Sequence, residues 1–338
     1  GGATRPKMQT NAPPAEWYTG WTLDAEPHAA RKSAILRKYP EVTKLYGHAP
    51  SSKWWVILSV VAQMYTAYIM RDKSWWILLP VAYIWGATIN HSLQLTAHEL
   101  CHNLFFANPT HNLLFGFVAN MPIPPAMMVT FKKYHIMHHL YQGQDGWDPD
   151  LPTKWEADFF QGPIKKFLFL CLQPFIYSLR PMFRQPLPPS GWEIAQWISQ
   201  ICINTCVIYF WGIKSFWYLL LSSFIGASIH PLAAHFVSEH YEWEKGAETY
   251  SYYGILNKLT YNVGYHYEHH DFPRIAGPNL PKLKAIASEF YDPLPQHKSW
   301  LGVMWRFVFD KGLSPASRTV RPYKAIGTCN NTVLLKKD

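Results

Sequence analysis

Histidine is the residue type whose spacing in this sequence points to chemistry. Eight of the 16 histidines fall in three short segments: His98 and His102 in HELCH, His135, His138 and His139 in HIMHH, and His266, His269 and His270 in HYEHH. On a helix, side chains three and four positions apart share one face, with Cβ atoms ~5–6 Å apart. Imidazoles grouped in this way can chelate a metal ion. One such pair is a weak signal, but three clusters together predict a metal centre.

The number of histidines indicates more than one ion. Eight ligands are too many for a single tetrahedral zinc. Two ions that each need five or six positions would use these ligands and leave a position open. A redox metal beside a membrane suits O₂ chemistry on a lipid chain, although spacing alone does not separate two irons from copper or two zincs.

A further segment, HPLAAHFVSEH, holds three more histidines near the end of an apolar stretch. A ninth ligand from this segment would bring the membrane domain into the metal centre, and we predict that His235 is that ligand. The roles of His230 and His240 stay open, with hydrogen bonding at the membrane surface as their ordinary alternative. The isolated histidines are expected to be ordinary core or surface residues: His28, His48, His111 and His297.

Four acidic residues lie inside or just after the clusters. Glu99 and Glu268 are within the first and third clusters, and Asp145 and Asp148 follow the second. Carboxylates in such places can orient imidazole N–H groups, or bind a polar substrate headgroup. The alternatives are helix-surface carboxylates and a turn capped by Asp. No catalytic group beyond the metal centre is indicated.

Apolar stretches supply the elements that would position these residues. We predict four transmembrane helices in two hairpins, spanning about 54–70, 75–96, 194–212 and 216–236. Residues 1–53 contain eight Lys and Arg, whereas the two opposite loops contain three, so the termini and the central loop are expected in the cytosol. All three clusters then lie on the cytosolic side, where they can converge. The predicted fold is an all-α, multi-pass integral membrane protein with a cytosolic helical cap that holds a histidine-rich di-metal centre.

Composition limits the function classes. Hydrophobic residues make up 49% of the chain, there are 16 Trp, and the net charge is +9. This charge would suit nucleic acid or an anionic membrane surface, and the apolar stretches favour membrane lipids and exclude nucleic acid. The five Cys form no C-x-x-C pair, which argues against a disulfide framework or a Cys-ligated zinc. We divide the chain into an N-terminal module (1–53), a membrane domain (54–321) and a polar tail (322–338).

Several motifs resemble those of the sphingolipid Δ4-desaturases, within the membrane fatty-acid desaturase/hydroxylase superfamily. They are NHSLQLTAHELCHN (90–103), HPLAAHFVSEHYEW (230–243), ETYSYYG (248–254) and NVGYHYEHHDFP (262–273). The segment PHAARKSAILRKYPEV (27–42) is typical of the N-terminal module of that family. The resemblance covers residues 17–321, and all eight clustered histidines are present.

This resemblance implies a non-haem di-iron oxidoreductase of the endoplasmic reticulum membrane. The implied reaction desaturates dihydroceramide at C4–C5 of the sphingoid base, using O₂ and electrons from NAD(P)H through a reductase and cytochrome b5. The chain has no HPGG haem motif, so cytochrome b5 would be a separate partner. The alternatives are a C4-hydroxylase or a bifunctional enzyme, an acyl-lipid desaturase, and a metal transporter without turnover, which would need polar residues along its spans.

Overall fold

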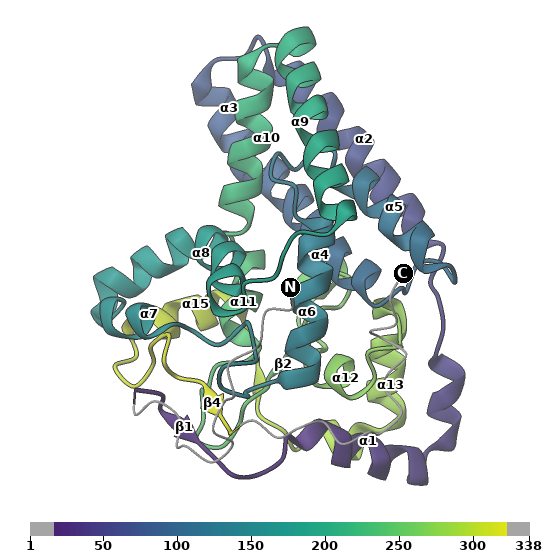
Figure 1. Cartoon of the computed structure of the whole chain (residues 1–338), viewed down its shortest axis with the longest axis vertical. Helices are drawn as coiled ribbons and strands as arrows, with labels where there is room; N and C mark the ends of the chain where they lie inside the picture. The colour runs from purple at the N-terminus through teal and green to yellow at the C-terminus, as the bar shows by residue number, and fades with distance from the viewer. Residues whose placement is uncertain (1–16, 323–338) are drawn as a thin grey trace, which may run out of the picture.

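A computed structural model describes residues 17–322 of the chain, and it is predominantly helical (Figure 1). Residues 1–16 of the predicted N-terminal module, and all but the first residue of the predicted tail, lie outside this range. The longer helices are α1 (Pro27–Lys38), α2 (Ser52–Met70), α4 (Ala87–Cys101), α5 (Pro109–Asn120), α6 (Met128–Tyr141), α8 (Gly162–Arg184), α9 (Gly191–Trp211), α10 (Ile213–Gly226) and α15 (Trp300–Phe309). The mostly helical fold that the sequence predicts is confirmed.

Short elements connect these helices. They are α3 (Trp75–Val81), α7 (Lys154–Phe159), α11 (His235–Ser238), α12 (His266–Asp271), α13 (Leu280–Ile286), α14 (Ser288–Tyr291), the π-helical turn η2 (Ala82–Gly86), and the 3₁₀ turns η1 (Pro40–Leu45), η3 (Pro231–Ala234), η4 (Ile255–Leu259) and η5 (Gly277–Asn279). Four two-residue strands form two parallel pairs, β1 (Gly20–Trp21) with β4 (Thr319–Val320), and β2 (Ser251–Tyr252) with β3 (Gln296–His297).

A helical bundle projects from a broader body, as Figure 1 shows. It contains α2, the continuous helical segment from α3 through η2 to α4, and the pair α9 and α10. Within the described residues, the stretch Ile213–Ser238 is long and apolar enough to cross a membrane. The bundle holds the four predicted segments, and their assignment as four membrane spans stays a prediction.

The fourth predicted span, 216–236, is not one regular helix in the structure. Helix α10 ends at Gly226, short of the predicted end at residue 236. A Cβ at Gly226 would lie 2.7 Å from the carbonyl oxygen of Ala87, so glycine allows α10 and α4 to approach closely at this point. Pro231 then begins η3, and the imidazole of His230 accepts a hydrogen bond from the backbone N–H of Leu232. The chain therefore turns here and directs the following histidines toward the body.

Several buried polar side chains in the bundle form hydrogen bonds with one another. Asn90 donates to the hydroxyl of Ser223 over 2.8 Å, and the hydroxyl of Tyr218 donates to the amide oxygen of Gln63 over 3.0 Å. Gln63 also donates to the carbonyl of Gly86. Because buried polar groups are costly when unpaired, these bonds fix how α2, α4 and α10 pack together.

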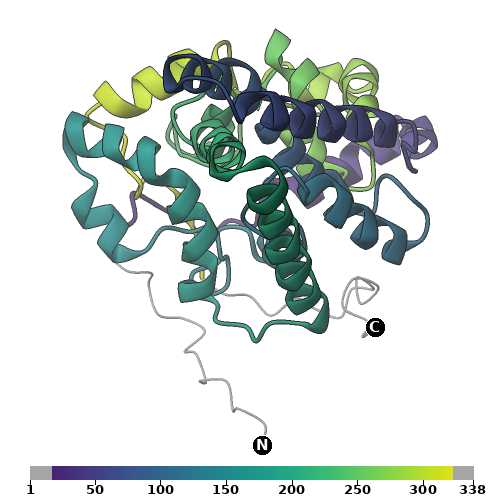
Figure 2. The ribbon, with the colours of Figure 1, turned by 90° about the horizontal axis from the view of Figure 1, so that it is seen from above.

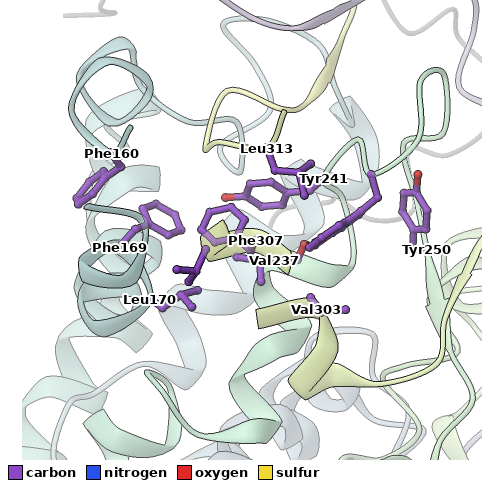
Figure 3. Close-up of a cluster of buried hydrophobic side chains, with 11 residues drawn as sticks. Phe160, Phe169, Leu170, Val237, Tyr241, Tyr250, Val303, Phe307 and Leu313 are labelled. Atoms are coloured by element: carbon purple, nitrogen blue, oxygen red, sulfur yellow. The ribbon is translucent and has the colours of Figure 1, made fainter. Parts of the chain in front are cut away.

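Two helices of the body carry apolar faces. Helices α8 and α15 pack side by side at one side of the body, and Figure 2 shows this side from above. Their buried faces meet in a core that includes Phe169 and Phe307, whose ring centroids are 5.6 Å apart (Figure 3). Their outer faces expose Phe183 and Trp305. Helix α8 continues through Pro174 and Pro181, which lie inside it.

The N-terminal module packs against the last third of the chain. Ile35 of α1 and Val42 of η1 share a buried cluster with Tyr267, Phe272 and Leu283. The parallel pairing of β1 with β4 adds a second connection between the two ends of the described chain. These contacts place α1 directly behind the third histidine cluster.

Candidate metal centre

Eight histidine side chains gather into two neighbouring groups. The first group consists of His98, His102, His135, His139 and His269, and the second group consists of His138, His240 and His270. Within each group the ligand nitrogens lie within 4.8 Å of one another. Among the described residues, these are the sets of histidine, cysteine and acidic side chains that could hold a metal ion.

Three helices bring most of these rings together. The C-terminal end of α4 supplies His98 and His102, and α6 supplies the second cluster. The cluster on α6 divides, because His135 and His139 face the first group while His138 faces the second. The short helix α12 likewise contributes His269 to the first group and His270 to the second.

The distances between ring nitrogens match those of metal ligands. The Nε2 atoms of His135 and His139, of His139 and His269, and of His138 and His240 are each 3.0 Å apart. A neutral imidazole has one N–H, so a ring that meets several others in this way cannot satisfy them all by hydrogen bonding. Ligands at right angles around an ion with bonds of about 2.1 Å would be ~3.0 Å apart. The spacing therefore fits ions between the rings.

Several Nε2 atoms in the groups have no hydrogen-bonding partner in the described structure. They belong to His98, His102 and His270, and each is buried. An unpaired buried polar atom costs ~1–3 kcal/mol unless something else satisfies it. These orphaned nitrogens are explained if each one donates its lone pair to a metal ion.

Burial keeps the rings in the form that binds metal. It lowers the pKa of His102, His135, His139 and His269 well below the usual value, and nearby imidazoles lower each pKa further. In the second group, burial acts in the same direction on the pKa values of His240 and His270. A neutral imidazole offers a lone pair, so these rings are ready to coordinate at neutral pH.

His138 is oriented by a buried carboxylate. Its Nδ1 lies 3.0 Å from Oδ1 of Asp148, which is fully buried. Burial alone would lower the pKa of His138, but the contact with Asp148 outweighs it and raises the pKa. Asp148 in turn has a lowered pKa despite burial, because His138 and nearby donors stabilise its charge. The carboxylate fixes the tautomer of His138 and points Nε2 into the second group.

The structure places His235 and His266 differently from the grouped rings. Nδ1 of His235 lies 3.0 Å from Oε1 of Glu239, and its Nε2 has no partner. The Nε2 of His266 lies 2.8 Å from that of His240, and its Nδ1 is 3.7 Å from Glu239. His266 therefore borders the second group, whereas the predicted ninth ligand, His235, lies outside both groups and His240 lies within one.

The other predicted acidic residues have structural partners. Glu99 accepts from the backbone N–H of Gly277 over 3.0 Å, and its nearest approach to His98 is 3.9 Å. Asp145 pairs with Arg184 over 3.0 Å. Glu268 accepts hydrogen bonds from Ser251 and Tyr253, and burial raises its pKa to about 7. Among the four acidic candidates, Asp148 is the one with a hydrogen bond to a grouped histidine.

A cavity of about 310 Å³ opens beside the rings. His98, His135, His138, His240 and His266 line one part of it. The rest is largely apolar and includes Leu95, Ile123, Phe131, Phe224 and Phe236. An apolar cavity with polar groups at one end suits a lipid chain, and it would place part of that chain next to the metal ligands.

Comparison with known proteins identifies related families and relatives. The fatty acid desaturase family matches residues 73–300, and the family described as sphingolipid Delta4-desaturase matches residues 18–51. The chain is 46% identical to sphingolipid delta(4)-desaturase DES1 of Drosophila melanogaster, over 91% of this chain and 97% of that protein. It is 45% identical to human sphingolipid delta(4)-desaturase DES1 and 46% identical to the rat sphingolipid delta(4)-desaturase/C4-monooxygenase DES2, in each case over 90% of this chain and 95% of the relative.

Proposed function

The chain belongs to the fatty acid desaturase family, in its sphingolipid Δ4-desaturase branch, and from that premise we propose that it desaturates dihydroceramide at C4–C5 to give ceramide. One observation carries the proposal. Buried imidazoles from three separated clusters meet in two groups beside an apolar cavity. This arrangement suits an oxidation on a lipid chain, and the names of the relatives supply the substrate class.

We propose two non-haem irons as the metals. The first group would hold one iron, and the second group with His266 would hold the other. His240 takes the place that the sequence prediction gave to His235, because its Nε2 meets those of His138 and His266. Bound iron supplies the activation of O₂ that removal of hydrogen from an unactivated C–H bond requires. Spacings near 3 Å and orphaned nitrogens support this ligand set.

The side chains around the irons would orient ligands and position the substrate. Asp148 holds the tautomer of His138, and Glu239 lies between His235 and His266. The apolar walls exclude water from the reacting methylene pair and restrict how the chain lies. Selecting one pair among many similar methylenes is then a matter of placement, which can contribute much of the rate acceleration.

Electrons for O₂ reduction would come from a separate cytochrome b5 and its NAD(P)H-dependent reductase. The chain would lie in the endoplasmic reticulum membrane with α2, α3–α4, α9 and α10 as four spans, and with both termini in the cytosol. Large apolar side chains exposed on α2 and α9 support the placement in lipid. They include Trp54, Leu58, Val61, Ile198, Ile201 and Phe210.

C4 hydroxylation is the second candidate activity. The rat relative is named as both a desaturase and a C4-monooxygenase, and the two outcomes share the first removal of hydrogen. They diverge in whether oxygen is then transferred to the substrate carbon. An acyl-lipid desaturase or a transporter has no comparable support from the relatives.

Product analysis tests the proposal. Membranes from cells without endogenous activity, expressing this chain and supplied with NADH, cytochrome b5 and its reductase, receive isotope-labelled dihydroceramide. We expect labelled ceramide by mass spectrometry. His138→Ala and His269→Ala should abolish product while membrane insertion is retained. His111→Ala, outside both groups, is the matched control and should behave as wild type.

Two results would count against the proposal. A dominant C4-hydroxylated product would make hydroxylation the main reaction. Iron-loaded protein that gives neither product, with the electron-transfer partners shown to be active, would contradict the substrate assignment.

A further inference from the structure

Helix α1 of the N-terminal module contacts the segment that carries the third histidine cluster. His28, near the start of this helix, is buried, and its ring centroid lies 4.9 Å from that of His270. The guanidinium of Arg31 lies over the ring of Tyr267 on α12, 5.1 Å from the ring centroid. The module therefore lies against the metal centre and not on a remote surface.

Both ring nitrogens of His28 have polar partners, and Nδ1 also lies 2.9 Å from Nη2 of Arg31. Nδ1 of His28 lies 2.8 Å from Oδ1 of Asp271, and its Nε2 lies 3.1 Å from Oγ1 of Thr249. A carboxylate has no proton to give, so Nδ1 carries the hydrogen and donates it to Asp271. Nε2 then accepts from the hydroxyl of Thr249. His28 is thus a fixed bridge between two chain segments.

Arg31 reinforces the same carboxylate. Its Nε and Nη2 lie 2.7 and 2.9 Å from the two oxygens of Asp271. Paired donors of this kind fix the orientation of a carboxylate as well as its position. The side chain of Asp271 is fully buried, so without Arg31 and His28 a buried charge would be left unpaired.

Both bridged segments carry rings of the second group. Asp271 directly follows His270 in α12. Thr249 directly follows Glu248, whose carbonyl oxygen lies 3.4 Å from Nδ1 of His240. His28 therefore lies behind two of the three rings of the second group, and the third, His138, has its own partner in Asp148.

We propose that His28 and Arg31 of the N-terminal module are positioning residues for the second metal site, so that the module forms part of the metal centre. This inference rests on the proposed binding of two irons. It assigns to residues 18–51, the part matched by the second family, the task of holding His240 and His270 in place.

The test measures how much iron each of the two sites holds. Full-length wild type, His28→Leu and Arg31→Met are purified in detergent and loaded with ⁵⁷Fe(II) under anaerobic conditions. Iron per chain is measured by mass spectrometry, and Mössbauer spectra resolve the two sites. Wild type should hold two irons. Both variants should lose one iron per chain and one of the two quadrupole doublets, while the other doublet is unchanged.

Matched variants separate positioning from general stability. Arg37→Met removes an exposed arginine from the same helix and should retain two irons. His28→Asn keeps a donor toward Asp271 and should restore part of the lost iron. Retention of both irons and both doublets in His28→Leu and Arg31→Met would overturn the proposal, as would equal loss from both sites. Because iron is measured without substrate, the outcome does not depend on whether dihydroceramide is the substrate, and a wild-type protein without iron would instead refute the proposed cofactor.

Discussion

Replacing Asp148 with Asn tests how the second site is held. The carboxylate accepts three hydrogen bonds in a fully buried position. Oδ1 receives Nδ1–H of His138 over 3.0 Å and the backbone N–H of Asp150 over 2.9 Å, and Oδ2 receives the backbone N–H of Gly143 over 2.8 Å. Asn has nearly the same shape, but one of its two terminal atoms is an NH₂ donor. At one or more of these contacts, the NH₂ group of Asn would then face an N–H group, and no hydrogen bond could form there.

The loss of folding free energy depends on which carboxylate oxygen of Asp148 the amide nitrogen of Asn replaces. In the place of Oδ1 it would leave two donors without an acceptor, and in the place of Oδ2 it leaves only Gly143, so the second orientation is favoured. One buried unsatisfied N–H costs about 1–3 kcal/mol of folding free energy. His138 then donates to a neutral oxygen instead of a charged one. Loss of such an orienting partner typically lowers metal affinity about 10–100-fold.

The assay combines iron competition with thermal unfolding of the apo protein in detergent. We expect Asp148→Asn to yield iron to a chelator at lower chelator concentration than wild type, and to melt at a lower temperature. Asp145→Asn is the matched control, since this residue of the same loop pairs with Arg184 and does not contact a histidine. Wild-type iron retention together with wild-type melting in Asp148→Asn would contradict this role of Asp148.

Three further predictions address other parts of the molecule. His240→Ala should lose about one iron per chain by metal analysis, while His235→Ala, outside both groups, should retain two; the reverse pattern would support His235, the ninth ligand that the sequence predicts. His297, whose pKa burial lowers to about 4, adds stability that is present above pH ~6.5 and is lost as pH falls toward 4. The melting temperature of His297→Gln should therefore depend less on pH in that window, and parallel curves would contradict the assignment. Gly226→Ala places a Cβ 2.7 Å from a carbonyl oxygen of α4 and should destabilise the protein by about 1–3 kcal/mol, measured by thermal melting, whereas Gly191→Ala, with open space around it, should not.

The spacing of histidines predicts which side chains can converge but not how they divide. In H-x-x-H-H on α6, periodicity places all three rings on one face. The structure then sends His135 and His139 to one group and His138 to the other, because α6 passes between two sets of partners. That division depends on tertiary packing and leaves no local signal.

The local sequence does not determine which of His235 and His240 lies within the second group. His235 lies at the end of the apolar stretch and His240 just after it, and two residues five positions apart do not share one helical face. The choice depends on the break after Gly226 and on the turn at Pro231, which rotate the segment before it reaches the body. An uninterrupted helix to residue 236, as the sequence predicts, would orient this segment differently.

His28 could not be assigned from its own neighbourhood either. In the sequence it is an isolated histidine, 243 positions from Asp271, and isolated histidines are usually ordinary. Tertiary packing gives it its partners, Asp271 at the end of α12 and Thr249 just before β2. In contrast, the apolar stretches predict the bundle helices well. Most of the predicted helix ends lie within a few residues of the observed ends.

The pairing of β1 with β4 has a consequence for how the protein is made. The strand near residue 20 can pair only after the strand near residue 319 has been synthesised. Arg318 and Arg321, in the same late segment, form ion pairs with Asp150 and Glu248, respectively. During translation these last partners emerge only after every histidine has left the ribosome. The nascent chain therefore passes through a stage in which every histidine of the two groups has been made but Arg318 and Arg321 have not yet paired with Asp150 and Glu248, so the surroundings of the candidate metal centre are completed last.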